Sequence, residues 1–126
     1  MFNRIQATGV MRMFNFLNVD ILVDYLHENV VFTSDWVLAP IYGKEDLVDY
    51  LENKLATMKD CVKAGDCGYY SRLVKSAHYP DEIFVWLGYR VGQETGEIYI
   101  QTVICEETQL IQAIRFLHGL DDVEFI

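Results

Sequence analysis

The residues with the clearest capacity for chemistry are an aspartate, a tryptophan and two tyrosines near the middle of the chain. Asp35 follows a β-branched, aromatic stretch and directly precedes Trp36. A carboxylate beside an indole in a cleft loses its hydration, which raises its pKa and suits it to act as a general base. Tyr42 and Tyr50 offer hydroxyls that can donate to a developing oxyanion. Asp35 is therefore the candidate for a catalytic residue, but we favour an ordinary turn or cap aspartate, because aspartates are common at such loops.

The cysteines and histidines do not form a reactive set. Cys61 and Cys67 have no second cysteine pair and no nearby histidine, so their spacing does not make a zinc site. No phosphate-binding loop or nucleophile motif is present either, and we expect no metal and no cofactor. Three reduced thiols are expected, with a Cys61–Cys67 bridge as the alternative in an oxidising compartment. Cys105 lacks a neighbouring positive charge, so we interpret it as a buried structural residue.

Helical periodicity in the first half predicts the elements that must position these side chains. An apolar stripe predicts a first helix, through Val10, Met13, Phe14 and Leu17. A second, shorter stripe follows, through Ile21, Leu22, Tyr25 and Leu26. Asn18 or Asp20 can cap a break between the two. Residues 29–34 read as a first strand, followed by a loop with Trp36, Pro40 and Gly43. A helix begins at Lys44, and residues 59–68 are expected to be a loop that can hold the end of a strand.

Strand periodicity fills the second half of the chain. Strands are predicted at residues 70–77, 83–91, 97–106 and 110–118, and together they form an antiparallel meander. Both faces of the strand at 83–91 are apolar, because Val85 and Leu87 alternate with Phe84 and Trp86. Helices can cover one face. We expect a second copy of the chain to cover the other, with loops or the C-terminal tail as the alternative cover.

Composition limits the classes of partner. The chain has 126 residues, which suits a single domain spanning 1–126, and a formal net charge of −9 disfavours nucleic acid and anionic lipid surfaces. No apolar run approaches the length of a membrane span. The first residues lack the apolar core and cleavage site of a secretion signal, so we expect a soluble cytoplasmic protein.

The order of these patterns resembles the NTF2-like superfamily, including its SnoaL-like and ketosteroid-isomerase branches. The resemblance rests on a bent helical hairpin, a strand ending at residues 33–36, a loop with Pro40 and Gly43, a helix from Lys44, and a meander closing at residues 106–111. It implies an α+β fold of the NTF2-like, cystatin-like kind: a cone in which a curved, mostly antiparallel sheet wraps around N-terminal helices. Many members of the family dimerise through the outer sheet face, and their pocket lies inside the cone.

The resemblance also allows one activity to be tested residue by residue. Ketosteroid isomerases use an aspartate base at the end of the first strand, a helix tyrosine and a protonated strand aspartate. The base position falls on Ser34, or on Asp35 if the alignment slips by one residue, which would turn the carboxylate to the opposite face. The other two positions fall near Val10 or Met11 and near Ile98. Isomerase chemistry of that kind is therefore not the expected function.

Two functions from different classes remain. The first is a small-molecule binding protein, or an enzyme acting on a hydrophobic ligand, with an apolar pocket between helices and sheet. Its expected pocket residues are Trp36, Tyr42, Tyr50 and Phe14, although Trp36 is equally consistent with rim packing. The second is a non-catalytic protein-interaction module, such as an immunity or adaptor protein, whose acidic surface meets a basic partner. We favour the ligand-binding function.

Overall fold

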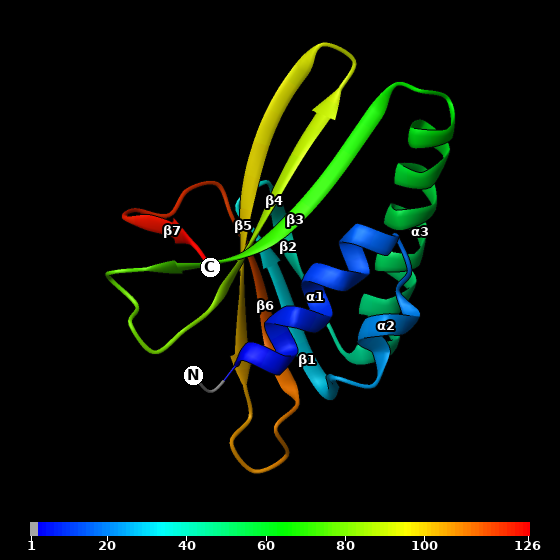
Figure 1. Ribbon diagram of the computed structural model, residues 1–126. Helices are drawn as coiled ribbons and strands as arrows, with labels where there is room; N and C mark the ends of the chain where they lie inside the picture. The colour runs from blue at the N-terminus through cyan, green and yellow to red at the C-terminus, as the bar shows by residue number, and fades with distance from the viewer. Residues whose placement is uncertain (1–2) are drawn as a thin grey trace.

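Two helical segments begin the chain, as the apolar stripes predicted, but the second is shorter than its stripe: Tyr25 lies beyond it and Leu26 begins the first strand. The computed structural model describes residues 3–126, except the side chain of Val37 (Figure 1). Helix α1 (Arg4–Phe16) buries Val10, Met13 and Phe14, and helix α2 (Asp20–Val23) buries Leu22. The predicted break is confirmed. Leu17 adopts a left-handed conformation (φ 50°) that ends α1, and the Asn18 side chain accepts a hydrogen bond from the Asp20 amide at 3.0 Å.

Seven strands form one mixed sheet. They are β1 (Leu26–Ser34), β2 (Val37–Tyr42), β3 (Cys67–Ser76), β4 (Phe84–Val91), β5 (Glu94–Ile104), β6 (Ile111–Leu117) and β7 (Val123–Phe125). Their order across the sheet is β2-β1-β6-β5-β4-β3-β7. Only the β1–β6 pair is parallel among the described strands, so the predicted antiparallel meander of the second half is confirmed.

Two predicted loops are wrong. The segment with Pro40 forms strand β2, because it lies at the edge of the sheet, where a residue without an amide hydrogen is tolerated. Helix α3 (Lys44–Lys63) continues through the first half of the polar segment 59–68 that we expected to be a loop, and β3 begins at Cys67, within the part expected to hold a strand end. Those polar side chains lie on the solvent side of the helix, so they do not oppose helix formation. Gly65, at φ 80°, lies in the short turn between α3 and β3.

The helices and the sheet enclose a single large core. Helix α1 crosses the concave side of the bent sheet and α3 lies along one edge of the same side (Figure 1). The inward face of α3 buries Leu47, Leu51, Leu55 and Met58. One face of β4 and β5 meets them, as the strand alternation predicted, through Ile83, Val85, Leu87, Ile98 and Ile100. Gln101 lies on the opposite face, where its amide contacts Glu82 at 3.0 Å.

The other face of the sheet is partly covered by the C-terminal segment. Phe84, Val74 and Tyr99 form a second buried cluster, against which Leu120 and Val123 pack. In Figure 1 the segment that carries β7 lies on the side of the sheet away from the helices. This is the alternative cover that the sequence left open. It removes Phe84 from the surface that we expected a second copy to bury.

Two asparagines fasten the ends of α1 to the sheet. The Asn3 amide donates to the Ile83 carbonyl at 2.7 Å and to the Thr102 hydroxyl at 3.1 Å, and its oxygen accepts from the Ile83 amide at 2.9 Å. At the other end, Asn15 makes the same two backbone contacts with Ser71. Each side chain satisfies both backbone groups of one residue, Ser71 within β3 and Ile83 directly before β4, as a neighbouring strand would.

The cysteine prediction is wrong for two of the three residues. Cys61, in the last turns of α3, and Cys67, the first residue of β3, form a disulfide with a Cα–Cα distance of 5.3 Å. The short turn between the two elements brings them together. Cys105 is free but only partly buried, contrary to the expected buried position. Hydrogen bonds from Thr108 lower the pKa of its thiol.

No helix among residues 3–126 is long and apolar enough to cross a membrane.

Candidate functional site

A cavity of about 320 Å³ lies between α3 and the concave face of the sheet. We call it the inner cavity. Six elements and one turn line it, through Ser34, Trp36, Tyr50, Lys54, Met58, Tyr69, Leu87, Tyr89, Ile98 and Phe116. Its volume is at the lower end of the range for small-molecule sites.

Helix α3 contributes Tyr50, Lys54 and Met58 to the inner cavity. These residues are four apart, so they lie one above another on the same helix face. Sequence reasoning found Tyr50 and missed Lys54, because a helix lysine that follows an acidic and a polar residue reads as solvated. The spacing was the available signal: Lys54 falls within the inward stripe that Leu51, Leu55 and Met58 define.

Lys54 is the charged residue of the inner cavity. Burial lowers the pKa of its amine, and burial is the only cause of that shift. Among the described residues, no carboxylate lies within ion-pair distance of the amine. No cluster of three metal-ligating side chains occurs in residues 3–126 either. The inner cavity therefore offers one half-buried cation without an anion.

The sheet supplies aromatic walls and an apolar floor. Tyr69 and Tyr89 are direct partners on neighbouring strands β3 and β4, so their side chains lie on the same face. Phe116 packs edge-on against Phe32, with ring centroids 4.8 Å apart. Leu87, two residues before Tyr89, continues the apolar surface. The two tyrosines could not be assigned to the site from sequence, because only strand pairing brings them together.

At the end of β1, the adjacent side chains of Ser34 and Asp35 lie on opposite sides of the chain. Ser34 lines the inner cavity, and the next side chain, Asp35, faces away from it. The Asp35 carboxylate accepts a hydrogen bond from the His118 amide at 2.9 Å and contacts the His118 imidazole Nδ1 at 2.5 Å. These contacts lower the pKa of Asp35, and the hydrogen bond from the His118 backbone amide makes the largest contribution. The expected rise by desolvation is thus wrong, because the carboxylate is solvent-exposed and hydrogen-bonded.

The predicted pocket residues divide into two groups. Trp36 and Tyr50 line the inner cavity, Trp36 at its rim with 55% of its surface exposed. Phe14 is fully buried behind the wall, with its ring centroid 6.1 Å from that of Phe116. Tyr42 is not in the lining. It ends strand β2 and is 67% exposed, because its strand lies at the sheet edge.

The positions compared with ketosteroid isomerases also have defined places. Ser34 and Ile98 both line the inner cavity, and neither carries a carboxyl group. Val10 is buried in α1. The catalytic groups of that chemistry are therefore lacking at these positions.

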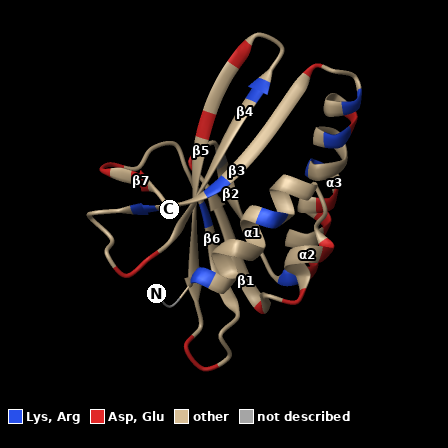
Figure 2. Cartoon of the chain, viewed as in Figure 1, with Lys and Arg blue, Asp and Glu red and all other residues tan. Residues whose placement is uncertain are grey.

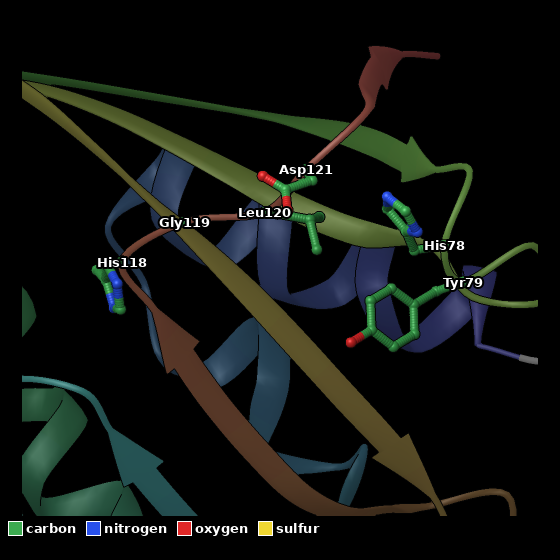
Figure 3. A pocket seen from close by; sticks show the side chains of 6 residues that line it. All are labelled: His78, Tyr79, His118, Gly119, Leu120 and Asp121. Carbon is green, nitrogen blue, oxygen red and sulfur yellow. The ribbon is translucent and has the colours of Figure 1, made fainter.

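A second hollow, of about 550 Å³, lies on the opposite face, beside the turn after β3 and the segment after β6. Its lining includes two histidines, His78 and His118, and each imidazole contacts an aspartate: His78 contacts Asp122 at 2.8 Å, and His118 contacts Asp35. In Figure 3 the two imidazoles lie at opposite ends of the hollow. They do not converge on one point, and the hollow is more open than the inner cavity, so we place the candidate site in the inner cavity.

Comparisons with known proteins bear on the fold. No protein-family model and no curated protein matches the sequence. Solved structures do match: a steroid delta-isomerase from Pseudomonas aeruginosa is 15% identical with a TM-score of 0.67, over 98% of this chain and 80% of that one. A Mycobacterium tuberculosis protein in complex with estradiol-17beta-hemisuccinate gives the same identity and TM-score over 98% of both chains. An NTF2-like protein of unknown function from Cytophaga hutchinsonii is 14% identical, with a TM-score of 0.59 over 98% of this chain and 89% of that one.

At these identities the similarity concerns the fold, and the fold agrees with the one that the sequence pattern predicted: a curved sheet with helices on its concave side. The chain therefore has the cystatin-like α+β fold of the NTF2-like superfamily.

Proposed function

We propose that the protein binds a small, largely apolar molecule in the inner cavity. The observation that carries the proposal is the cavity itself, in which an apolar surface of Leu87, Ile98 and Phe116 faces hydroxyl groups across a volume of about 320 Å³. Such a combination of apolar walls and a few polar groups is typical of small-molecule sites. The complex of the M. tuberculosis neighbour with estradiol-17beta-hemisuccinate supports a ligand site in this fold.

A neutral fluorescent dye tests this proposal. Nile red is expected to bind with increased fluorescence, and Ile98→Phe, which adds volume on the cavity wall, is expected to weaken binding at least tenfold. Val62→Phe, on the 41%-exposed outer side of α3, is the matched control and keeps the affinity. Equal affinity of the Ile98→Phe variant would place the dye elsewhere. Mass spectrometry of the purified protein for a retained small molecule provides an independent readout.

The acidic surface is the observation relevant to a protein-interaction function. Carboxylates gather on the solvent side of α3 near its beginning, from Glu45, Asp46, Asp49 and Glu52 (Figure 2). Negative charge in the first turn of a helix also stabilises the helix dipole, so Glu45 and Asp46 have a structural explanation. We therefore retain ligand binding as the proposed function, and enzymatic activity is not part of the proposal.

A homodimer through the outer sheet face remains our proposal for assembly. The support is a groove of about 440 Å³ on that face, where Val31, Val103 and Ala113 lie among polar side chains. Sedimentation at micromolar concentration tests it, because a species of 14.6 kDa at all concentrations would refute it. A cytoplasmic location also remains a proposal, and the Cys61–Cys67 disulfide counts against it.

A further inference from the structure

The polar side chains of the inner cavity share one property. Ser34, Trp36, Tyr50, Lys54, Tyr69 and Tyr89 can all donate a hydrogen bond, and no carboxylate, histidine or amide side chain is in the lining. The remaining lining residues are apolar. The hydroxyls can also accept, whereas Lys54 and Trp36 only donate, so a ligand that brings acceptors can satisfy every polar group of the lining, and negative charge suits the lysine best.

The donors are available to a ligand. Among the described residues, the Lys54 amine and the hydroxyls of Tyr50, Tyr69 and Tyr89 make no side-chain hydrogen bond to the protein. The Ser34 hydroxyl oxygen accepts from the Trp36 amide at 3.2 Å, so its own hydrogen remains free to donate. The Lys54 amine and the three tyrosine hydroxyls are not among the fully buried, unpaired polar atoms, so each keeps some accessible surface.

The position of Lys54 distinguishes it from a surface lysine. It lies between Tyr50 and Met58 on the inward face of α3, half-buried, with burial lowering the pKa of its amine. A buried cation without a partner is unfavourable, and a carboxylate at hydrogen-bond distance relieves this cost through a charge-assisted bond. The net charge of −9 opposes the approach of anions, but at physiological salt this repulsion is screened beyond about 8 Å.

From this arrangement we infer that the ligand is a monocarboxylate with an apolar body, whose carboxylate pairs with Lys54 while the body lies against Leu87, Ile98 and Phe116. The inference rests on the proposed function and specifies the chemical class of its ligand. No bond is made or broken, since the complex is held by one ion pair, hydroxyl donors and apolar contact.

Decanoate and decanol form the test, because they share an apolar chain and differ in charge. Titration calorimetry at neutral pH, below the concentration at which decanoate forms micelles, measures both affinities. The protein is expected to prefer decanoate, and Lys54→Met is expected to weaken decanoate binding about tenfold or more, the usual effect of losing a hydrogen bond to a charged group. Decanol binding is expected to stay within about threefold, since its contacts are apolar.

Two further variants make the result specific. Lys54→Arg keeps the positive charge and is expected to keep most of the preference for decanoate. Lys59→Met removes an exposed lysine of the same helix outside the cavity and is expected to change neither affinity. An unchanged decanoate affinity in Lys54→Met, or an equal loss for both ligands, refutes the inference. If the protein binds decanol as tightly as decanoate, this inference alone is refuted. If it binds neither ligand, the proposed function is refuted as well.

Discussion

The attachment of α1 to the sheet gives a prediction whose size follows from the structure. Asn3 is 3% exposed and makes three hydrogen bonds, two with the backbone of Ile83 and one with Thr102, which is 2% exposed. Each such bond contributes about 1 kcal/mol, and the Ile83 groups left behind lie where water does not reach them. Asn3→Ala is therefore expected to lower the free energy of unfolding by about 3 kcal/mol.

The comparison variant is Asn15→Ala at the other end of α1. Asn15 contacts the backbone of Ser71 in the same way and also accepts from the Ser71 hydroxyl at 3.0 Å. Ser71 is 1% exposed, but the Asn15 side chain is exposed, so its removal opens a path by which water can replace the lost bonds. We expect a loss of about 1 kcal/mol there. Loss of helix capping does not explain the difference, because the Asn3 side chain makes no capping bond to α1.

Urea unfolding followed by circular dichroism measures both changes, and thermal unfolding provides a second measurement. For a chain of this length, 3 kcal/mol corresponds to a fall in Tm of roughly 10 °C. The reasoning is refuted if Asn3→Ala costs less than about 1 kcal/mol, or no more than Asn15→Ala, because burial would then not control the cost of the missing bonds.

Three other predictions concern Lys54, Asp35 and the disulfide. The pKa of Lys54 is lowered in the folded protein, so its charge destabilises the fold below that pKa, and the effect disappears as the pH rises toward 10.5. Lys54→Met should therefore stabilise the protein at pH 7 by at most about 1 kcal/mol, and the gain should be smaller in unfolding experiments at alkaline pH. The pKa of Asp35 is lowered in the folded protein, so its contribution to stability is present above pH 3.8 and is lost as the pH falls through the pKa of the folded state. Asp35→Asn should therefore make unfolding less sensitive to acid and leave the affinity for Nile red unchanged. A weakened affinity would show that Asp35 takes part in ligand binding. Cys61 and Cys67 close a short loop with a separation of six residues, so reduction should cost about 2 kcal/mol and lower the Tm by roughly 7 °C in calorimetry, whereas no change on reduction would contradict the bridge.

Much of the fold was predictable because local periodicity reports which side chains are buried. The stripe of Val10, Met13 and Phe14 predicted α1, and the alternation through Val85 and Leu87 predicted β4 with two apolar faces, one of which meets the helices. Strand β2 was missed, because Pro40 signals a turn unless the strand lies at a sheet edge, and edge position is a tertiary property.

The candidate site divides in the same way. The sequence by itself determined that α3 presents one face to the sheet, which placed Tyr50, and it contained the spacing that placed Lys54. Only the tertiary structure decided that Tyr69 and Tyr89 share a wall and that Asp35 turns outward to His118. The shared wall of Tyr69 and Tyr89 depends on pairing between strands, and the direction of Asp35 depends on the alternation of side chains, in which a shift of one residue changes the face. Neither can be read from local composition, because each depends on which segments meet in the folded chain.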